Sequence, residues 1–228
     1  MEYRPPSAAN GPLVIADISG YTSFLRDVAD AHPDAFADGA IPNAYALISS
    51  LLDGIIQRLV PPFTLSKIEG DAVFAFAEGA DAVPGGVALI ECLATCYADF
   101  RRTLGMAQQA TICTCGVCSR DNLDLKFVLH AGPFVMQSIG GSRELSGPEV
   151  VMAHRLFKTD AGALVGNRAY ALISESAAAR FAIPTEDAVS LAESFEHYPP
   201  IDLHVFPLSE VRSAPSARAT RPDRSLST

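Results

Sequence analysis

The stretch that decides the fold is "LVIADISGYTSFL", residues 13–25. An apolar run that reads as a buried strand ends at Asp17, and Ser19 and Gly20 then lead into a predicted helix over 21–31. The first backbone amides of a helix lack partners within that helix and suit a phosphate group. Because a core strand rarely ends on a carboxylate without a reason, this turn is a candidate functional site.

A second stretch, "FTLSKIEGDAVFAFAEG" (residues 63–79), predicts two strands around a tight turn at Glu69, Gly70 and Asp71. In a ferredoxin-type sheet the first strand lies beside such a hairpin, so Asp17 and Asp71 should meet at one edge. Paired carboxylates at strand ends hold Mg²⁺ against substrate phosphates. The alternatives are ordinary ones: a strand-end aspartate that caps a helix, and a Gly-Asp pair that serves only the turn.

The remaining segments complete a βα(α)ββαβ order, an α+β, ferredoxin-like fold with helices packed on one face of the sheet. Helical spacing covers 44–59 and 82–105. "LDLKFVLHAGPFVM" predicts a strand, a turn at Gly132-Pro133 and a further strand, and "GPEVVMAHRLFK" predicts a short helix. The expected domains are a loose N-terminal arm over 1–11, the folded domain over 12–208 and a disordered tail over 209–228.

Charge and hydropathy exclude several classes of partner. The formal net charge is -9, and residues 212–228 contribute +3 of it, so the rest of the chain carries -12. Such an acidic body argues against nucleic-acid binding. No apolar run is long enough for a membrane span, which predicts a cytoplasmic protein with reduced thiols.

The quoted motifs resemble those of class III adenylate/guanylate cyclase domains, in a divergent bacterial branch. "VIADISGYTSFL" is similar to their opening strand, turn and helix, and "SKIEGDAVFAF" is similar to their metal-binding hairpin. "LKFVLHAGPFVM" and "LSGPEVVMAHRLFK" resemble their later strand pair and short helix. The likeness covers residues 12–158 and continues weakly to 208.

The resemblance implies specific roles for residues of this chain. It implies two Mg²⁺ or Mn²⁺ ions, a purine nucleoside triphosphate as ligand, and a head-to-tail homodimer. The matching positions are Asp17, Asp71 and the Ile18 carbonyl for the metals, Gly20, Tyr21 and Thr22 for the triphosphate, Lys67 for the purine, and Arg155 for the pentavalent phosphorus.

Two positions depart from the family pattern. Val151 stands where the family has a ribose-orienting asparagine, and Pro148 stands at the second purine-selecting position. Neighbouring Glu149 would replace it only after a shift in register. The implied activity is therefore conversion of ATP to cyclic AMP and pyrophosphate, weak if present. The alternative is a catalytically degenerate cyclase-homology module with a regulatory or protein-interaction role.

The cysteines suggest a second metal site. Cys113, Cys115 and Cys118 form a CxCxxC run that would aim three thiolates at one zinc ion, with Cys96 or Cys92 from the preceding helix as the fourth ligand. The alternative is that all five thiols pack as small hydrophobic groups. Two histidines are expected to have structural positions: His130 as a hydrogen-bonded core residue and His154 on a solvated helix face.

Overall fold

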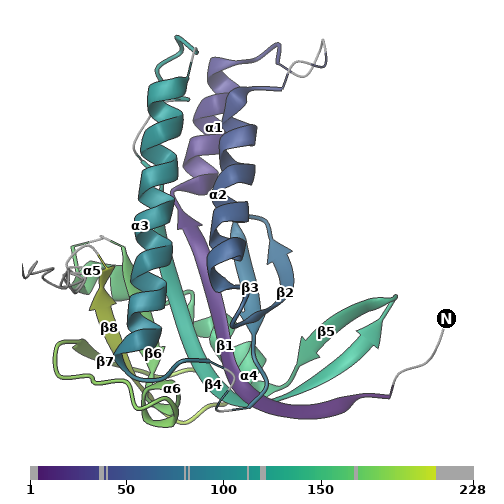
Figure 1. Ribbon diagram of the computed structural model, residues 1–228, viewed down its shortest axis with the longest axis vertical. Coiled ribbons are helices and arrows are strands. Elements are labelled where there is room, and N and C mark those ends of the chain that lie inside the picture. The colour runs from purple at the N-terminus through teal and green to yellow at the C-terminus, as the bar shows by residue number, and fades with distance from the viewer. Residues whose placement is uncertain are drawn as a thin grey trace, which may run out of the picture.

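The computed structural model (Figure 1) describes residues 5–35, 39, 41–79, 81, 83–111, 113–118, 122–166 and 169–208. The tail expected over 209–228 lies outside these residues. The described chain forms one eight-stranded mixed sheet in the order β2-β3-β1-β4-β6-β8-β7, with β5 paired to β4. None of the described helices combines the length and the hydropathy that a membrane span requires.

The element order confirms the expected βα(α)ββαβ core, which is followed by a smaller second half. The core consists of β1 (Ser7–Ser19), α1 (Tyr21–Ala31), α2 (Asn43–Leu59), β2 (Thr64–Glu69), β3 (Ala72–Phe76), α3 (Val87–Ala110) and β4 (Asp124–Ile139). The second half consists of β5 (Ser142–Ser146), α4 (Pro148–Leu156), α5 (Ala161–Leu164), β6 (Tyr170–Ser174), α6 (Glu175–Arg180), β7 (Val189–Glu193) and β8 (Ile201–Pro207).

β1 is the central strand of the core and determines which side chains reach each face. Successive residues of a strand point to opposite faces. Val14, Ala16 and Ile18 pack with the long helices α1, α2 and α3, so these helices share one face as expected. Leu13 and Ile15 point the other way, into a second apolar cluster that includes the short α4.

Three boundaries differ from those that the sequence predicted. α3 begins at Val87 and not at 82, because Gly85 and Gly86 precede it and Gly86 has a φ of 58°. β1 begins at Ser7, so residues 7–11 of the expected arm belong to the sheet. The turn expected at Gly132-Pro133 was wrong: the long β1 stays paired with β4 past this point, so both strands bend together and continue.

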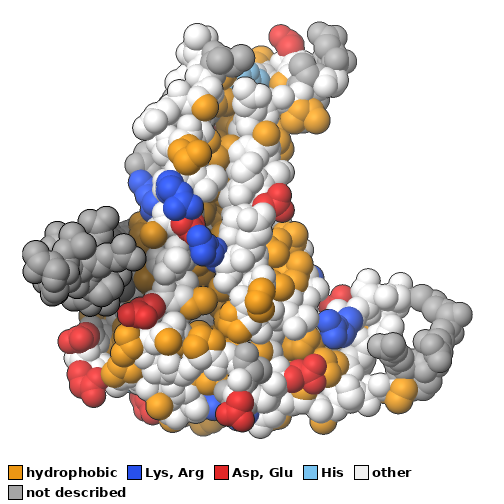
Figure 2. All heavy atoms as spheres, viewed as in Figure 1, with side chains coloured by type: hydrophobic (Ala, Val, Ile, Leu, Met, Phe, Trp, Pro, Cys, Tyr) orange, Lys and Arg blue, Asp and Glu red, His pale blue; other side chains and the backbone are white. Residues whose placement is uncertain are grey.

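The three long helices extend beyond the end of the sheet (Figure 1). We call this projection, made of α1, the start of α2 and the end of α3, the helical arm. The His32 position that ends α1 and residues 113–118 that follow α3 form its tip. A groove of about 420 Å³ runs between α2 and α3 along the arm. Figure 2 shows hydrophobic side chains exposed along this face of the arm.

Candidate functional site

Asp17 lies near the end of β1, on the face that carries α4. Only 6% of the residue is exposed. Its strand neighbours are Ala72 on β3 and Lys126 on β4, and the Lys126 Nζ atom lies 3.3 Å from an Asp17 carboxylate oxygen. The ammonium group also lies 4.2 Å from the centre of the Phe157 ring. A buried carboxylate is thus balanced by one partly buried cation.

Asp71 is brought to Asp17, as the sequence predicted. The hairpin turn places Asp71 directly before β3, and its carbonyl oxygen accepts a hydrogen bond of 3.2 Å from the Ile18 amide. Burial raises the pKa of Asp17 to about 6; Lys126 opposes this rise, and Asp71 adds to it. Two carboxylates with a single ammonium group beside Asp17 leave an excess of negative charge, and the oxygen donors suit Mg²⁺ or Mn²⁺.

The turn between β1 and α1 depends on Gly20. Its φ is 86°, and a Cβ atom at this position would lie 2.3 Å from the Asn122 carbonyl oxygen, so no other residue fits without a backbone shift. Gly20 itself has no side chain that could cap the helix, so it leaves the first amides of α1, at Tyr21 and Thr22, without a side-chain cap. Burial and then the nearby Asp71 raise the pKa of the Tyr21 hydroxyl.

A polar cavity adjoins this end of the sheet. It has a volume of about 250 Å³ and extends from Lys126 across the neighbouring strand β6. Tyr170 and Asp160 line its far side, and burial followed by Asp17 and Asp160 raises the pKa of Tyr170. The cavity gives a small polar ligand room beside Lys126, the ion-pair partner of Asp17.

Lys67 on β2 forms ion pairs with two carboxylates. Its Nζ atom lies 3.0 Å from a Glu69 oxygen and 3.4 Å from a Glu144 oxygen on β5, and the hydrogen bond to Glu69 raises the pKa of Lys67. His154 on α4 lies 3.0 Å from the other Glu69 oxygen. The helix face of His154 is therefore only partly solvated, because its ring packs edge-on against Phe74 and its Nδ1 atom lies 2.8 Å from the Val150 carbonyl oxygen.

On α4, Arg155 has partners within the chain, whereas Val151 is exposed. The Arg155 Nη1 atom donates a 2.7 Å hydrogen bond to the Glu196 carbonyl, and its guanidinium lies 4.9 Å from the centre of the Tyr198 ring. Arg155 therefore contacts the segment that contains Glu196 and Tyr198, and no contact between Arg155 and Asp17 is found among the described residues. Val151 is 47% exposed, as an apolar residue on the outer face of α4.

Glu149 is also engaged. One of its oxygens lies 2.7 Å from Nε2 of His130, whose Nδ1 lies 2.8 Å from the Ser174 hydroxyl. His130 is 2% exposed, which confirms the expected hydrogen-bonded core histidine, and burial lowers its pKa. A Cβ atom on Gly132 would lie 2.5 Å from the Glu149 side chain, so this glycine leaves room for the pair. Glu149 is thereby held away from a purine-selecting role.

The cysteine run meets a histidine at the tip of the arm. Nε2 of His32 lies 3.5 Å from the Sγ atoms of both Cys113 and Cys118, and the four ligand atoms of His32, Cys113, Cys115 and Cys118 lie within 4.8 Å of one another. Burial acts to raise the pKa of Cys115, but hydrogen bonds from the Cys118 amide, the Cys113 thiol and the Val117 amide together outweigh burial. They lower this pKa to about 6.

The fourth member of this cluster is His32, and the choice of Cys96 or Cys92 was wrong. Cys96 lies fourteen positions before the end of α3, which corresponds to about 21 Å along a helix. Burial, with smaller contributions from Cys92 and Asp99, raises the pKa of Cys96 to about 12, as for a thiol packed in the core. Sequence spacing gave no sign of His32, which is 81 residues before Cys113.

Lys126 was the second functional side chain that sequence reasoning missed. Its signal was present in the pattern, because the antiparallel pairing of β1 with β4 places residue 126 directly beside Asp17. Finding it required the register of two strands that are more than one hundred residues apart. The predicted site residues at the start of α1 and in the hairpin are brought together, whereas Lys67 and Arg155 are held by other partners.

Solved structures with the same fold are nucleotide cyclase domains. The adenylyl cyclase CyaB from P. aeruginosa superposes with a TM-score of 0.64 at 15% identity, over 93% of this chain and 98% of that one. The guanylyl cyclase Cya2 gives a TM-score of 0.58 at 13% identity, over 90% and 94%. At such identities the likeness shows the class III cyclase fold, which confirms the resemblance that the motifs indicated.

Comparison of sequences finds a relative and a family model. A protein of Mycobacterium tuberculosis (strain ATCC 25618 / H37Rv), described as "Uncharacterized protein Rv2561/Rv2562", is 29% identical over 163 residues, which cover 68% of this chain and 73% of that protein. The family described as "Protein of unknown function (DUF2652)" matches residues 48–163, just over half of the chain. The protein therefore belongs to the DUF2652 family and has the fold of a class III nucleotide cyclase domain.

Proposed function

We propose that this protein binds a purine nucleoside triphosphate together with two Mg²⁺ or Mn²⁺ ions at the end of β1, as an adenylate cyclase-like domain. The observation that carries the proposal is the meeting of Asp17 and Asp71 beside the turn at Gly20. The two carboxylates and the Ile18 carbonyl would hold the metal ions. The backbone at Gly20, Tyr21 and Thr22 would hold the phosphates.

The bound metal would supply charge neutralisation at the phosphates and a lower pKa for the ribose 3′-hydroxyl. The chain's own residues would orient the triphosphate through the turn after Asp17. Lys126 would stay near the carboxylates as a fixed positive charge and help to accept an anionic ligand. An acidic protein needs such local positive charge to bind a triphosphate.

Conversion of ATP to cyclic AMP and pyrophosphate needs more than phosphate binding. The ribose and the purine must also be held, and the residues that would do so depart from the pattern or are occupied. Lys67 is paired with two carboxylates and Arg155 with a backbone carbonyl, while Val151 offers no hydrogen bond. We therefore propose weak turnover at most, in a head-to-tail homodimer that would supply the missing half from a second copy.

A catalytically degenerate module with a regulatory or protein-interaction role is the second candidate. The observation that favours it is the engagement of Glu149 with the buried His130. This contact holds the only carboxylate next to Pro148 away from a purine base. In this case the fold would be kept for binding alone.

The test is calorimetric binding of a non-hydrolysable ATP analogue with Mn²⁺, followed by mass detection of cyclic nucleotide with ATP. We expect binding by the full chain and loss of affinity by about tenfold or more in Asp17→Asn. Asp202→Asn, which removes an exposed carboxylate on β8, is the matched control and should bind normally.

The outcomes separate the two candidates. Binding with little or no cyclic AMP supports the proposal as stated. Rapid turnover would show that another residue has replaced the ribose contact and would overturn the weak-turnover part. No binding in the presence of Mn²⁺ would favour the interaction module, and binding that survives Asp17→Asn would place the nucleotide elsewhere.

A further inference from the structure

The tip of the helical arm brings together four side chains that the proposed nucleotide site does not use. His32 directly follows α1, and the three cysteines follow α3, so two distant segments of the chain converge there. All three thiols are free. Cys113 and Cys115 have Sγ atoms 3.1 Å apart, well beyond the length of about 2.0 Å of a disulfide bond.

The spacing of the donor atoms matches one tetrahedral ion. With Zn–S bonds of about 2.3 Å and a Zn–N bond of about 2.0 Å, a tetrahedral site separates nitrogen from sulfur by about 3.5 Å. Nε2 of His32 lies 3.5 Å from the Sγ atoms of both Cys113 and Cys118. The remaining separations do not exceed 4.8 Å, so small side-chain movements would complete the geometry.

The backbone is already shaped for this role. Cys115 and Cys118 form a CxxC turn, and Gly116 within it has a φ of 74°, which favours glycine. The amides of Val117 and Cys118 both lie 3.4 Å from the Sγ atom of Cys115 and donate to it. Amide donors of this kind orient a metal-bound thiolate and stabilise its charge.

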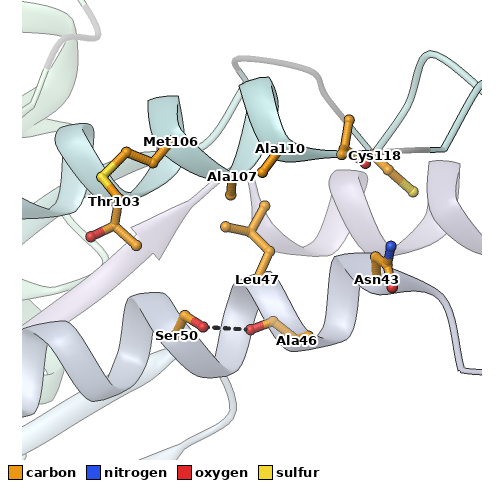
Figure 3. A pocket seen from close by; sticks show the side chains of 10 residues that line it. Asn43, Ala46, Leu47, Ser50, Thr103, Met106, Ala107, Ala110 and Cys118 are labelled. Carbon is orange, nitrogen blue, oxygen red and sulfur yellow. Dashed lines mark hydrogen bonds between the residues drawn. The ribbon is translucent and has the colours of Figure 1, made fainter.

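The arm also needs a constraint at this end. α1 has eleven residues, and its buried side chains are Phe24 and Val28, so the three residues after Val28 add no buried side chain that would hold the end of the helix. Helices of this length are marginal unless packing or another contact holds them. Cys118 lies at the end of the groove between α2 and α3, beyond Ala110 (Figure 3), so a link from His32 would reach all three long helices.

We propose that His32, Cys113, Cys115 and Cys118 bind one structural Zn²⁺ ion that ties the end of α1 to the segment after α3. The site is closed, because four protein ligands fill a tetrahedral ion and leave no position for substrate. Three thiolates and an imidazole select a soft metal, whereas the carboxylates at Asp17 and Asp71 select Mg²⁺ or Mn²⁺. The inference goes beyond the proposed nucleotide function and stands without it.

The test is metal analysis of the full chain purified without chelator. We expect about one zinc per chain in the unmodified protein, and a loss of most of that zinc in Cys115→Ser. Cys92→Ser removes a half-buried thiol outside the cluster and should keep the zinc. His197→Ala removes an exposed histidine and is the control for His32→Ala, which should lose zinc.

Replacement of the ion by Co²⁺ gives a readout that does not depend on folding yield. The Co²⁺ protein should show the visible absorption of tetrahedral cobalt with thiolate ligands, and His32→Cys should retain the metal with a spectrum shifted towards four thiolates. The proposal is overturned if the unmodified protein carries no zinc and gives no thiolate–cobalt absorption. It is also overturned if Cys92→Ser loses as much zinc as Cys115→Ser.

Discussion

The two ends of α1 carry two different groups of side chains. At its beginning, Asp17 and Asp71 meet beside Gly20, with Lys126 between the carboxylates and the cavity. At its end, His32 meets three cysteines within 4.8 Å. Eleven residues separate them, about 16 Å along a helix.

The difference lies in how complete each group is within one chain. The cluster at the arm tip has as many donors as a zinc ion requires, and they come from this chain alone. The group at the end of β1 has its carboxylates, but Lys67 and Arg155 are held by Glu69, Glu144 and the Glu196 carbonyl. A complete site predicts a stabilising role, whereas an incomplete one predicts that a ligand or a second copy must supply the rest.

The largest effect that we expect concerns the complete group. Removal of zinc with a chelator should lower the free energy of unfolding by several kcal/mol, because binding to a site that exists only in the folded chain adds directly to stability. Denaturant unfolding measures the change. Cys115→Ser should be equally unstable with or without the chelator, while Cys92→Ser should still respond to it. An unchanged unfolding midpoint after zinc removal would mean that the cysteines at the arm tip contribute to stability only by packing.

The next effect concerns the buried carboxylate. The folded protein holds a proton on Asp17 up to about pH 6, whereas an unfolded chain releases it near pH 4, so the ionised carboxylate destabilises the fold above that range. Without added Mg²⁺ or Mn²⁺, Asp17→Asn should be more stable than the unmodified protein by up to about 3 kcal/mol above pH 6. The difference should disappear as the pH falls from 6 towards 4.

Thermal or denaturant unfolding across pH 4 to 8 gives this comparison, with Asp202→Asn as the control. A variant that is less stable at every pH would mean that the ion pair with Lys126 outweighs the cost of burial. In that case Asp17 would serve mainly as a structural partner of Lys126, and its burial would not indicate an incomplete metal site.

The smallest effect concerns the cation beside Asp17. Lys126→Gln removes a positive charge 3.3 Å from the carboxylate that would bind the metal. Mn²⁺ binding at pH 8 should therefore become tighter by about tenfold, because the repulsion between the two cations is lost. Titration calorimetry with Mn²⁺ alone measures it. Lys158→Gln, an exposed change of equal charge, should leave the affinity unchanged; equal gains in both variants would point to net charge only.

Much of the fold was predictable because its signals are local. The apolar run into Asp17, the glycine at position 20 and the hairpin turn at Asp71 each fix a short piece of backbone, and β-strand alternation fixes which face each side chain takes. Those pieces predicted the βα(α)ββαβ order and the meeting of two carboxylates. The boundaries of β1 and α3 differed because they depend on pairing and on the glycines before Val87.

The sequence by itself determined which residues can do chemistry: two aspartates at strand ends, a glycine turn before a helix, and three closely spaced thiols. Only the tertiary structure decided their partners. His32 reaches the cysteines because the end of α1 and the segment after α3 converge at one tip, and Lys126 reaches Asp17 because β1 and β4 pair in a fixed register. The physical reason is that local spacing fixes the backbone conformation, whereas contacts between distant segments are set by how whole helices and strands pack.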